Sequence, residues 1–203
     1  MKIKLWELAL LMALILSILW GALLEQGQRE LEGKLVRFHV LANSDSPEDR
    51  ELKLYVRDRV WAELRLLFPA GESRAQAEVR IAEHLDEIAE IARQAVADRG
   101  GDYAVSAYLT RERYPTHAYE SFTLPAGVYH SLRLEIGDAQ GENWWCVVFP
   151  PICIQAVAGE LEIALEAAGL SEGEIALIRE GESGYALRFW VLELIDGVRG
   201  VFG

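Results

Sequence analysis

The sequence predicts an α+β domain that follows a single N-terminal hydrophobic helix. Two long stretches, 46–68 and 73–100, place apolar residues every three to four positions, which is the spacing of amphipathic helices. Shorter stretches at 35–42, 103–110 and 128–149 alternate or run apolar in the manner of strands. Short connections between the later strands favour a mostly antiparallel sheet. We expect an antiparallel helix pair to cover one face of this sheet.

Composition excludes several classes of protein. Of 203 residues, 51% are hydrophobic and 26% charged, which is enough apolar material for a core and too much for a disordered chain. The formal net charge of -12 argues against a nucleic-acid-binding protein, because phosphate contacts need a basic surface. Two cysteines are too few for a disulfide-dense scaffold or a four-thiolate zinc site.

The N-terminus predicts a membrane segment. Lys2 and Lys4 precede residues 5–24, in which Glu7 is the only charged side chain. A helix of this length spans about 30 Å, which matches the hydrocarbon core of a bilayer. A signal peptide (1–24, cleaved) and a retained transmembrane anchor both fit, and both export the remainder. We expect residues 25–34 to form a linker and residues 35–203 to form one exported domain.

The first strand and helix have clear local signals. In the strand at 35–42, Val36, Phe38 and Val40 share one face, and Arg37 and His39 lie on the other. The loop that follows leads into a helix for which Ser46 is the predicted N-cap. Pro47 suits the first helical position, and Asp49 completes a capping box with Ser46.

Local signals also predict the second helix and the later strands. Ser73 and Gln76 form a second capping box, and the helix is expected to run unbroken to Gly100. A weak strand is predicted near 119–124, and the strands at 128–136 and 144–149 are expected to form an antiparallel meander. The C-terminal part is expected to be helical, at 156–168 and 171–178, whereas the apolar run at 185–194 fits either a strand or a helix.

The sequence contains no recognisable catalytic constellation. The four histidines are dispersed, and none lies in a zinc-binding helical pair. No nucleophile elbow, phosphate-binding loop or dinucleotide fingerprint is present. The position of His39 on a strand predicts a hydrogen-bonded, partly buried side chain. We therefore expect no catalytic residue, no cofactor and no metal ion.

Two adjacent features near the end of the sheet are candidate sites. Cys146 and Cys153 could close a small disulfide loop in an exported protein, and free buried thiols fit equally well. Trp144 and Trp145 place one indole on each face of a strand. The inward ring belongs to the core, and an outward ring would suit contact with a protein partner.

Three blocks of the sequence resemble the stage II sporulation protein R family. They are residues 37–58, beginning RFHVLANSDSPED, residues 124–129 (LPAGVY) and residues 143–153 (NWWCVVFPPIC). The blocks occur in the family's order over roughly residues 35–153, and the N-terminal hydrophobic segment also fits.

The resemblance implies an exported sporulation signalling protein that is made in the forespore and enters the intermembrane space. There it would activate a membrane-embedded aspartic protease (stage II sporulation protein GA), which processes the precursor of the mother-cell sigma-E factor. The expected contact residues are Asn43, Ser44 and Asp45 with the outward-facing member of Trp144 and Trp145. The loop at 43–49 can also be explained as an ordinary strand-to-helix turn with no role in binding. The alternative function for the whole chain is an exported cell-wall hydrolase or glycan-binding module.

Overall fold

The computed structural model describes residues 4–69, 71–119, 122–152 and 158–179. The helices are α1 (Leu5–Glu32), α2 (Pro47–Leu64), α3 (Arg74–Glu83), α4 (Leu85–Asp98), α5 (Ala158–Ala167) and α6 (Glu172–Arg179). The strands are β1 (Val36–Leu41), β2 (Val105–Tyr114), β3 (His117–Ala118), β4 (Thr123–Leu124), β5 (Gly127–Ile136) and β6 (Asn143–Phe149). The expected α+β class is confirmed. The predicted strand or helix at 185–194 and Cys153 lie outside the described residues.

A four-stranded mixed sheet forms the centre of the domain. Its strand order is β2-β5-β1-β6, and β3 pairs with β4 in a separate two-stranded sheet. The pairings β2–β5 and β1–β6 are antiparallel, whereas β1 and β5 are parallel. The predicted meander of the last strands is wrong, because β1 lies between β5 and β6. All six residues of β1 are buried, which suits a central strand.

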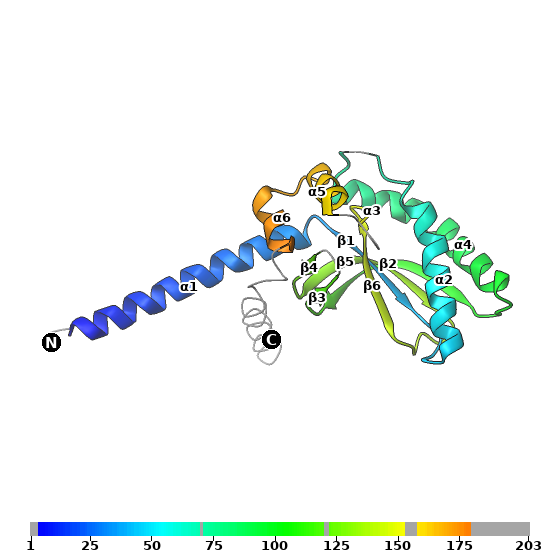
Figure 1. Cartoon of the computed structure of the whole chain (residues 1–203), viewed down its shortest axis with the longest axis horizontal. Coiled ribbons are helices and arrows are strands. Elements are labelled where there is room, and N and C mark those ends of the chain that lie inside the picture. Colours follow the sequence, from blue (N-terminus) through cyan, green and yellow to red (C-terminus); the bar gives the residue numbers. More distant parts are fainter. Residues whose placement is uncertain (1–3, 70, 120–121, 153–157, 180–203) are drawn as a thin grey trace.

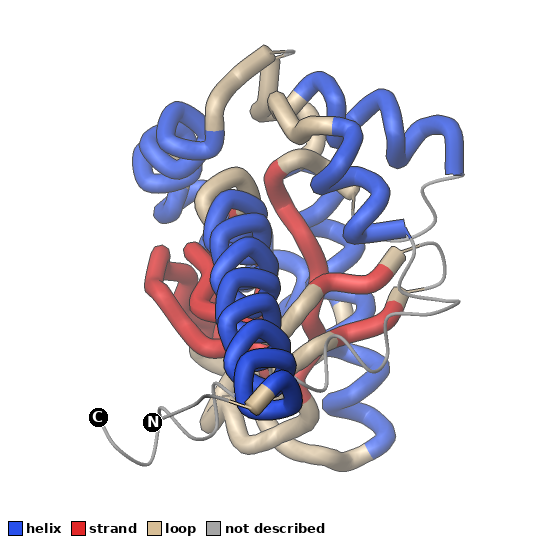
Figure 2. Tube along the Cα trace, turned by 90° about the vertical axis from the view of Figure 1, so that its left-hand side faces the viewer, coloured by secondary structure: helices blue, strands red, loops and turns tan. Residues whose placement is uncertain are grey.

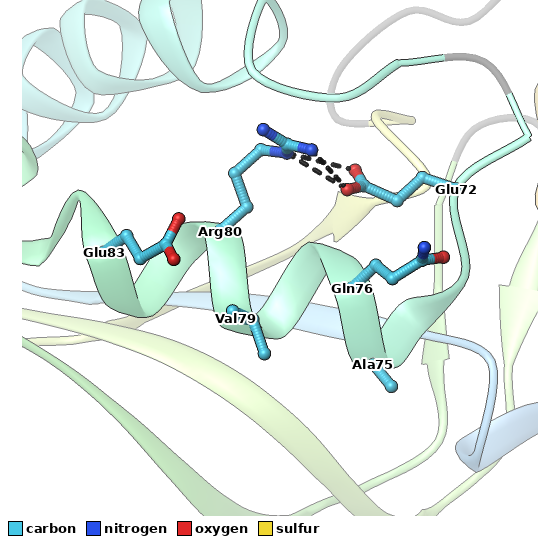
Figure 3. A pocket seen from close by; sticks show the side chains of 6 residues that line it. All are labelled: Glu72, Ala75, Gln76, Val79, Arg80 and Glu83. Carbon is cyan, nitrogen blue, oxygen red and sulfur yellow. Dashed lines mark hydrogen bonds and ion pairs between the residues drawn. The ribbon is translucent and has the colours of Figure 1, made fainter.

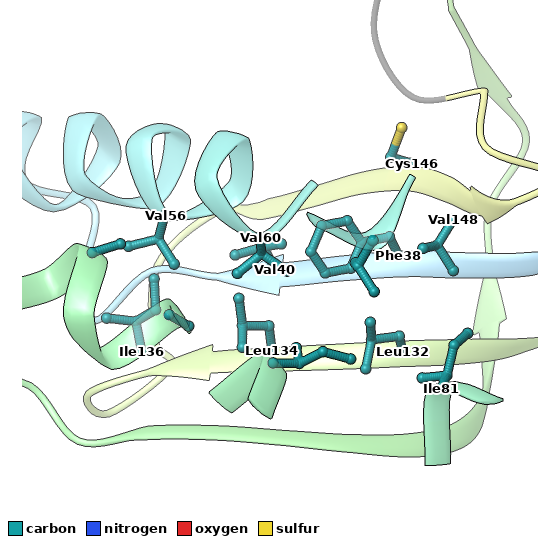
Figure 4. Packing of buried hydrophobic residues seen from close by; sticks show 14 of the residues in the cluster. Phe38, Val40, Val56, Val60, Ile81, Leu132, Leu134, Ile136, Cys146 and Val148 are labelled. Carbon is teal, nitrogen blue, oxygen red and sulfur yellow. The ribbon is translucent and has the colours of Figure 1, made fainter. Parts of the chain in front are cut away.

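The main core lies between the sheet and helices α2, α3 and α4. Figure 1 shows these helices together at one end of the molecule, and Figure 2 shows helices on both sides of the strands. In Figure 4, Phe38 and Val40 of β1 lie between Val56 and Val60 of α2 and the apolar residues of β5. Burial of such side chains stabilises the fold by about 1.5–3 kcal/mol each.

The opposite face of the sheet carries a second core at one end only. Leu31 from the end of α1, Leu35 just before β1, Tyr129 of β5 and Val147 of β6 are all fully buried there. Residues from β4, α5 and α6 complete this cluster. The other end of the same face is covered by no helix among the described residues.

The two predicted N-caps are present, with one difference at the first. Ser46 accepts from the backbone N–H of Asp49, but the Asp49 carboxylate turns to Asn43 and Ser44. Ser73 and Gln76 form the full reciprocal box. The predicted box at Ser46 is therefore half formed, because the loop before the helix supplies better partners for the carboxylate.

The predicted second helix is broken at His84. The ring Nδ1 of His84 is hydrogen-bonded to the carbonyl of Arg80 at 2.7 Å, and the backbone N–H of His84 bonds Ile81 instead. A side chain that occupies the i−4 carbonyl competes with the helix ladder. This competition separates α3 from α4.

The N-terminal helix α1 continues as far as Glu32, so most of the predicted linker at 25–34 is helical. Figure 1 shows α1 extending away from the body of the domain. Large apolar side chains between Leu5 and Leu16 are exposed. No helix in the described part of the chain meets the combined length and hydropathy expected of a membrane span. The membrane segment at 5–24 stays a prediction.

Candidate partner-contact surface

Polar side chains from four strands lie on the sheet face that points away from α2, α3 and α4. The pairing registers place Glu112 of β2, Arg133 of β5, His39 of β1 and Trp145 of β6 on this face. We call it the polar face. Its uncovered end is the best candidate for a functional surface, because half-buried polar and aromatic groups are accessible there.

His39 is the centre of the polar face. Its side chain is 7% exposed, and its two ring nitrogens lie 3.0 Å from Glu112 Oε2 and 2.7 Å from Asn143 Oδ1. The expected hydrogen bonding of this histidine is therefore confirmed, but the ring is buried and not partly buried as expected. Both nitrogens are occupied, so neither can accept a proton from a substrate. The two hydrogen bonds instead connect β1 to β2 and β6.

Glu112 is the acceptor on which this network converges. Burial alone would raise its pKa, but hydrogen bonds from His39, Ser131 and Tyr114 outweigh it and lower the pKa to about 2. Arg133 also donates to Glu112 Oε2 at 3.0 Å. The carboxylate is thus fixed in its charged form between a histidine and an arginine.

The network reaches solvent at Tyr108 and Glu135. Arg133 Nε donates to Glu135 Oε1 at 2.8 Å, and the Tyr108 hydroxyl donates to the same oxygen at 2.8 Å. Burial and this hydrogen bond raise the pKa of Tyr108. Tyr108 is 37% exposed, so it presents an aromatic ring at the open end of the polar face.

Arg37 occupies the covered end of the polar face. It is fully buried, donates to the Cys146 carbonyl at 3.0 Å and to the Tyr119 hydroxyl at 2.8 Å, and lies 4.2 Å from the centre of the Tyr114 ring. Burial raises the pKa of Tyr114 and Tyr119. Ring faces, a hydroxyl and a carbonyl stabilise this buried cation, so we assign Arg37 a structural role.

The two tryptophans lie on opposite faces of β6, as strand alternation predicts. Trp144 packs on the main core beneath the Arg57 guanidinium, 4.3 Å from its ring centre. Trp145 lies on the polar face, with its ring 6.0 Å from His39 and 5.6 Å from His117. Both are half-buried; Trp144 packs on the main core, whereas Trp145 packs against the second core and is the member of the pair on the polar face.

The loop at 43–45 is engaged within the molecule. Asn43 and Ser44 both donate to Asp49 Oδ2, at 2.9 and 2.5 Å. Burial would raise the pKa of Asp49, but these bonds lower it. Asn43 Oδ1 also accepts from the backbone N–H of Asp138. Asn43 and Ser44 therefore stabilise the turn, which is the simpler of the two interpretations made from sequence.

Asp45 connects this loop to the start of β6. It is exposed, and its Oδ1 accepts from the backbone N–H of Glu142 at 2.6 Å. Glu142 and Asn143 are exposed as well, and Asn143 bonds His39. Asn143 follows Glu142 in the chain, and Trp145 lies two positions further on the same face of β6. We call Asp45, Glu142, Asn143 and Trp145 the loop-end surface.

The remaining candidates are only partly described. Cys146 is buried and disulfide-bonded. Because Cys153 lies outside the described residues, its pairing with Cys146 stays a prediction. Within the described ranges, no group of three or more His, Cys, Asp or Glu side chains is placed to hold a metal ion.

A separate groove of about 460 Å³ runs along the outer side of α3. None of the residues expected to contact a partner lines it. Figure 3 shows Arg80 reaching across it to Glu72, with Arg80 Nη2 and Glu72 Oε1 2.8 Å apart. The Val79 side chain is exposed beside them. The ion pair fills the polar part of this groove, so it contributes to α3 rather than to the polar face.

Sequence reasoning missed Glu112 and Arg133. They are 73 and 94 residues from His39 along the chain, and only the β1–β5 and β5–β2 registers bring them together. One signal was available in the sequence. Tyr108, Thr110 and Glu112 are two positions apart along an extended strand, so their side chains share a face.

Comparison with known proteins identifies the family. The family model for stage II sporulation protein R matches residues 32–158. Stage II sporulation protein R of Bacillus subtilis (strain 168) is 36% identical over 118 residues, which cover 58% of this chain and 53% of the relative. The chain thus spans about half the length of this curated relative. No solved structure matches.

The matched segment holds β1 to β6, the loop-end surface and the His39–Glu112 pair. Both the sheet and the candidate surface therefore fall within the part that the family shares. The chain belongs to the stage II sporulation protein R family.

Proposed function

We propose that this chain is an exported signal that activates the membrane-embedded aspartic protease (stage II sporulation protein GA) responsible for processing the sigma-E precursor. Family membership supports the sporulation role. The activation step and the export into the space between forespore and mother cell are our extension of it. The N-terminal segment 5–24 would direct that export, as an anchor or as a cleaved signal.

The observation that carries this proposal is the loop-end surface at the uncovered end of the polar face. Exposed Asp45 is hydrogen-bonded to the backbone of exposed Glu142, and exposed Asn143 shares one face of β6 with the half-buried Trp145. A half-buried aromatic ring surrounded by polar groups is the usual composition of a protein-binding hot spot. We therefore assign the protease contact to these residues.

The rigidity of the surface suits binding by a preformed site. The His39–Asn143 bond fixes the first residue of β6, and the Asp45–Glu142 bond fixes the loop beside it. A preformed surface loses little conformational entropy on binding. It could then favour the active state of the protease through higher affinity for that state, with a coupling of about 1–3 kcal/mol.

The hydrolase alternative receives less support from the same geometry. A general acid or base needs a free proton position facing substrate. In His39 both nitrogens are occupied, and Glu112 is held in its charged form by several donors. Neither group therefore has a free proton position that faces a substrate.

The test is reconstitution. The full chain, purified in detergent, would be added to vesicles that carry the protease, and cleavage of the sigma-E precursor would be followed on a gel. We expect cleavage to require the chain, and Trp145→Ala to reduce it at least tenfold. The matched control is Trp144→Phe, on the other face of β6, which should retain cleavage. Equal activity of Trp145→Ala and the wild type would reject the assigned surface.

A further inference from the structure

Strand β2 forms an unusually regular edge of the sheet. Its ten residues pair with β5 in one continuous register from Val105–Ile136 to Tyr114–Gly127. Among the described strands, β5 is its only neighbour. An edge strand turns alternate backbone N–H and C=O groups outward, where they can pair with a further strand.

The main core is incomplete at this edge. Val105, Ala107 and Leu109 point toward the helices but are only partly buried. Their partners on β5, at positions 132, 134 and 136, are at most 1% exposed. Helices α3 and α4 reach β2 but leave these apolar side chains partly exposed beside its outward-facing backbone groups.

The side chains of β2 suit pairing with a second copy of the same strand. If two antiparallel β2 strands met with a twofold axis at Tyr108, the two Tyr108 rings would be neighbours. Ala107 would lie opposite Leu109 of the other copy, and Ser106 opposite Thr110. Apolar, aromatic and Ser–Thr cross-strand pairs each stabilise a sheet by roughly 0.2–1 kcal/mol.

Charge favours the same arrangement. The chain as a whole is acidic, with a net charge of -12, whereas the two exposed charged side chains of β2, Arg111 and Arg113, are both basic. With the axis at Tyr108, Arg111 lies opposite Val105, so no two arginines oppose each other. An axis at Thr110 would instead place Arg111 opposite Leu109, which separates the apolar side chains from one another.

We propose that two copies of this chain associate through antiparallel pairing of their β2 strands, with the twofold axis at Tyr108. The two four-stranded sheets then become one continuous sheet. Such a self-complementary contact is typical of twofold dimers. The inference does not depend on the proposed function, and if both hold, the dimer presents two loop-end surfaces.

Cysteine substitution in the full chain tests the register directly. At the axis, the two Cα atoms of residue 108 would be about 4.5–5.5 Å apart, which is within the range that a disulfide spans. Under mild oxidation in detergent, we expect Tyr108→Cys to give a cross-linked dimer on a non-reducing gel. Ser106→Cys alone should remain at the wild-type background, and a mixture of Ser106→Cys with Thr110→Cys should cross-link.

Two results would overturn the proposal: a Tyr108→Cys protein that stays at the wild-type background, or a Ser106→Cys protein that cross-links alone to the same extent. Neither measurement involves the protease, so failure here leaves the proposed function intact.

Protein mass gives a second, independent readout. By light scattering in detergent, we expect the wild-type protein component to have twice the 22.8 kDa mass of one chain. Tyr108→Lys opposes two ammonium groups at the axis and should return the mass to that of one chain. Val79→Lys, an exposed substitution on α3, should leave it doubled. A wild-type protein with the mass of one chain would contradict the proposal.

Discussion

At the residue scale, a buried histidine between two acceptors organises the polar face. His39 is almost inaccessible to water, and such a group is costly to bury unless it is hydrogen-bonded. Glu112 and Asn143 meet that requirement from strands on either side of β1 and β5. The same bonds fix Asn143, which belongs to the loop-end surface.

The low pKa of Glu112 predicts a specific dependence of stability on pH. The pKa in the folded state is about 2, below the ordinary value of 4.5, so the charged form is stabilised by folding. This contribution is complete above about pH 4.5 and is lost as the pH falls toward 2. Its upper bound is about 3 kcal/mol, and solvent screening reduces it to about 2 kcal/mol.

Glu112→Gln should therefore lower the free energy of unfolding by about 2 kcal/mol at pH 7, measured by urea denaturation. Between pH 4.5 and 2 the variant should lose less stability than the wild type. Glu135→Gln is the matched control, and because Glu135 is more exposed we expect a loss below about 1 kcal/mol. Parallel acid profiles for Glu112→Gln and the wild type would argue against the charged role.

Substitution of Asp45 distinguishes a role in partner contact from a role in stability. Asp45→Ala removes one hydrogen bond, to Glu142, and should cost about 1 kcal/mol of stability. If Asp45 touches the protease, processing of the sigma-E precursor should fall at least tenfold while the protein remains folded and exported. Asp138→Ala, with the same change of charge in the facing loop, should process normally. Equal processing by both variants would remove Asp45 from the contact surface.

At the element scale, the junction of two loops determines where the candidate surface forms. The loop between β5 and β6 passes the end of β1 and bonds it through Gln140 to Asn43 and Gly141 to Ala42. A Cβ at Gly141 would lie 2.3 Å from the backbone oxygen of Ser44. Only glycine permits so close an approach of the two backbones.

Gly141→Ala should accordingly force the loops apart and destabilise the protein by about 2–3 kcal/mol, measured as a lower melting temperature. Gly173→Ala is the control, because a Cβ there meets nothing within 4 Å and alanine favours the helix α6. It should leave stability unchanged or raise it slightly. If both variants melt at the wild-type temperature, the loop contact is looser than described.

The elements that sequence predicts well are those with local causes. Ser46, Ser73 and the Pro/Gly stops act within one turn of the chain, so the starts of α2 and α3 are confirmed. The position of β1 between β5 and β6 depends on contacts about 100 residues apart, which periodicity does not encode. The His39–Glu112 pair was missed for the same reason.

At the scale of the whole molecule, α1 is fixed to the domain. Gly33 directly follows its last turn, and the Gly33 carbonyl accepts from Arg74 of α3 at 2.8 Å. Lys34 pairs with the buried Glu174 of α6 at 2.7 Å, and Leu31 lies in the second core. The domain therefore has one orientation relative to the end of this helix.

Lys34→Met should weaken that junction. Burial raises the pKa of Glu174, but the bonds from Lys34 and Ser171 lower it overall, so loss of Lys34 leaves a buried carboxylate with fewer partners. We expect a loss of about 1 kcal/mol and faster amide hydrogen exchange in the last turn of α1. Arg179→Met breaks the exposed pair with Glu162 and should change neither. Unchanged exchange in both variants would mean that Lys34 does not hold the helix.

Our proposal has the protein act by binding its partner and not by chemical turnover. The direct measurement is the initial rate of sigma-E precursor cleavage by a fixed amount of vesicle-bound protease, titrated with purified full chain. Binding predicts that the rate rises in proportion to the chain and saturates near stoichiometric amounts. Full activation by a small fraction of one chain per protease, persisting after the chain is removed, would instead show a catalysed modification and contradict the account.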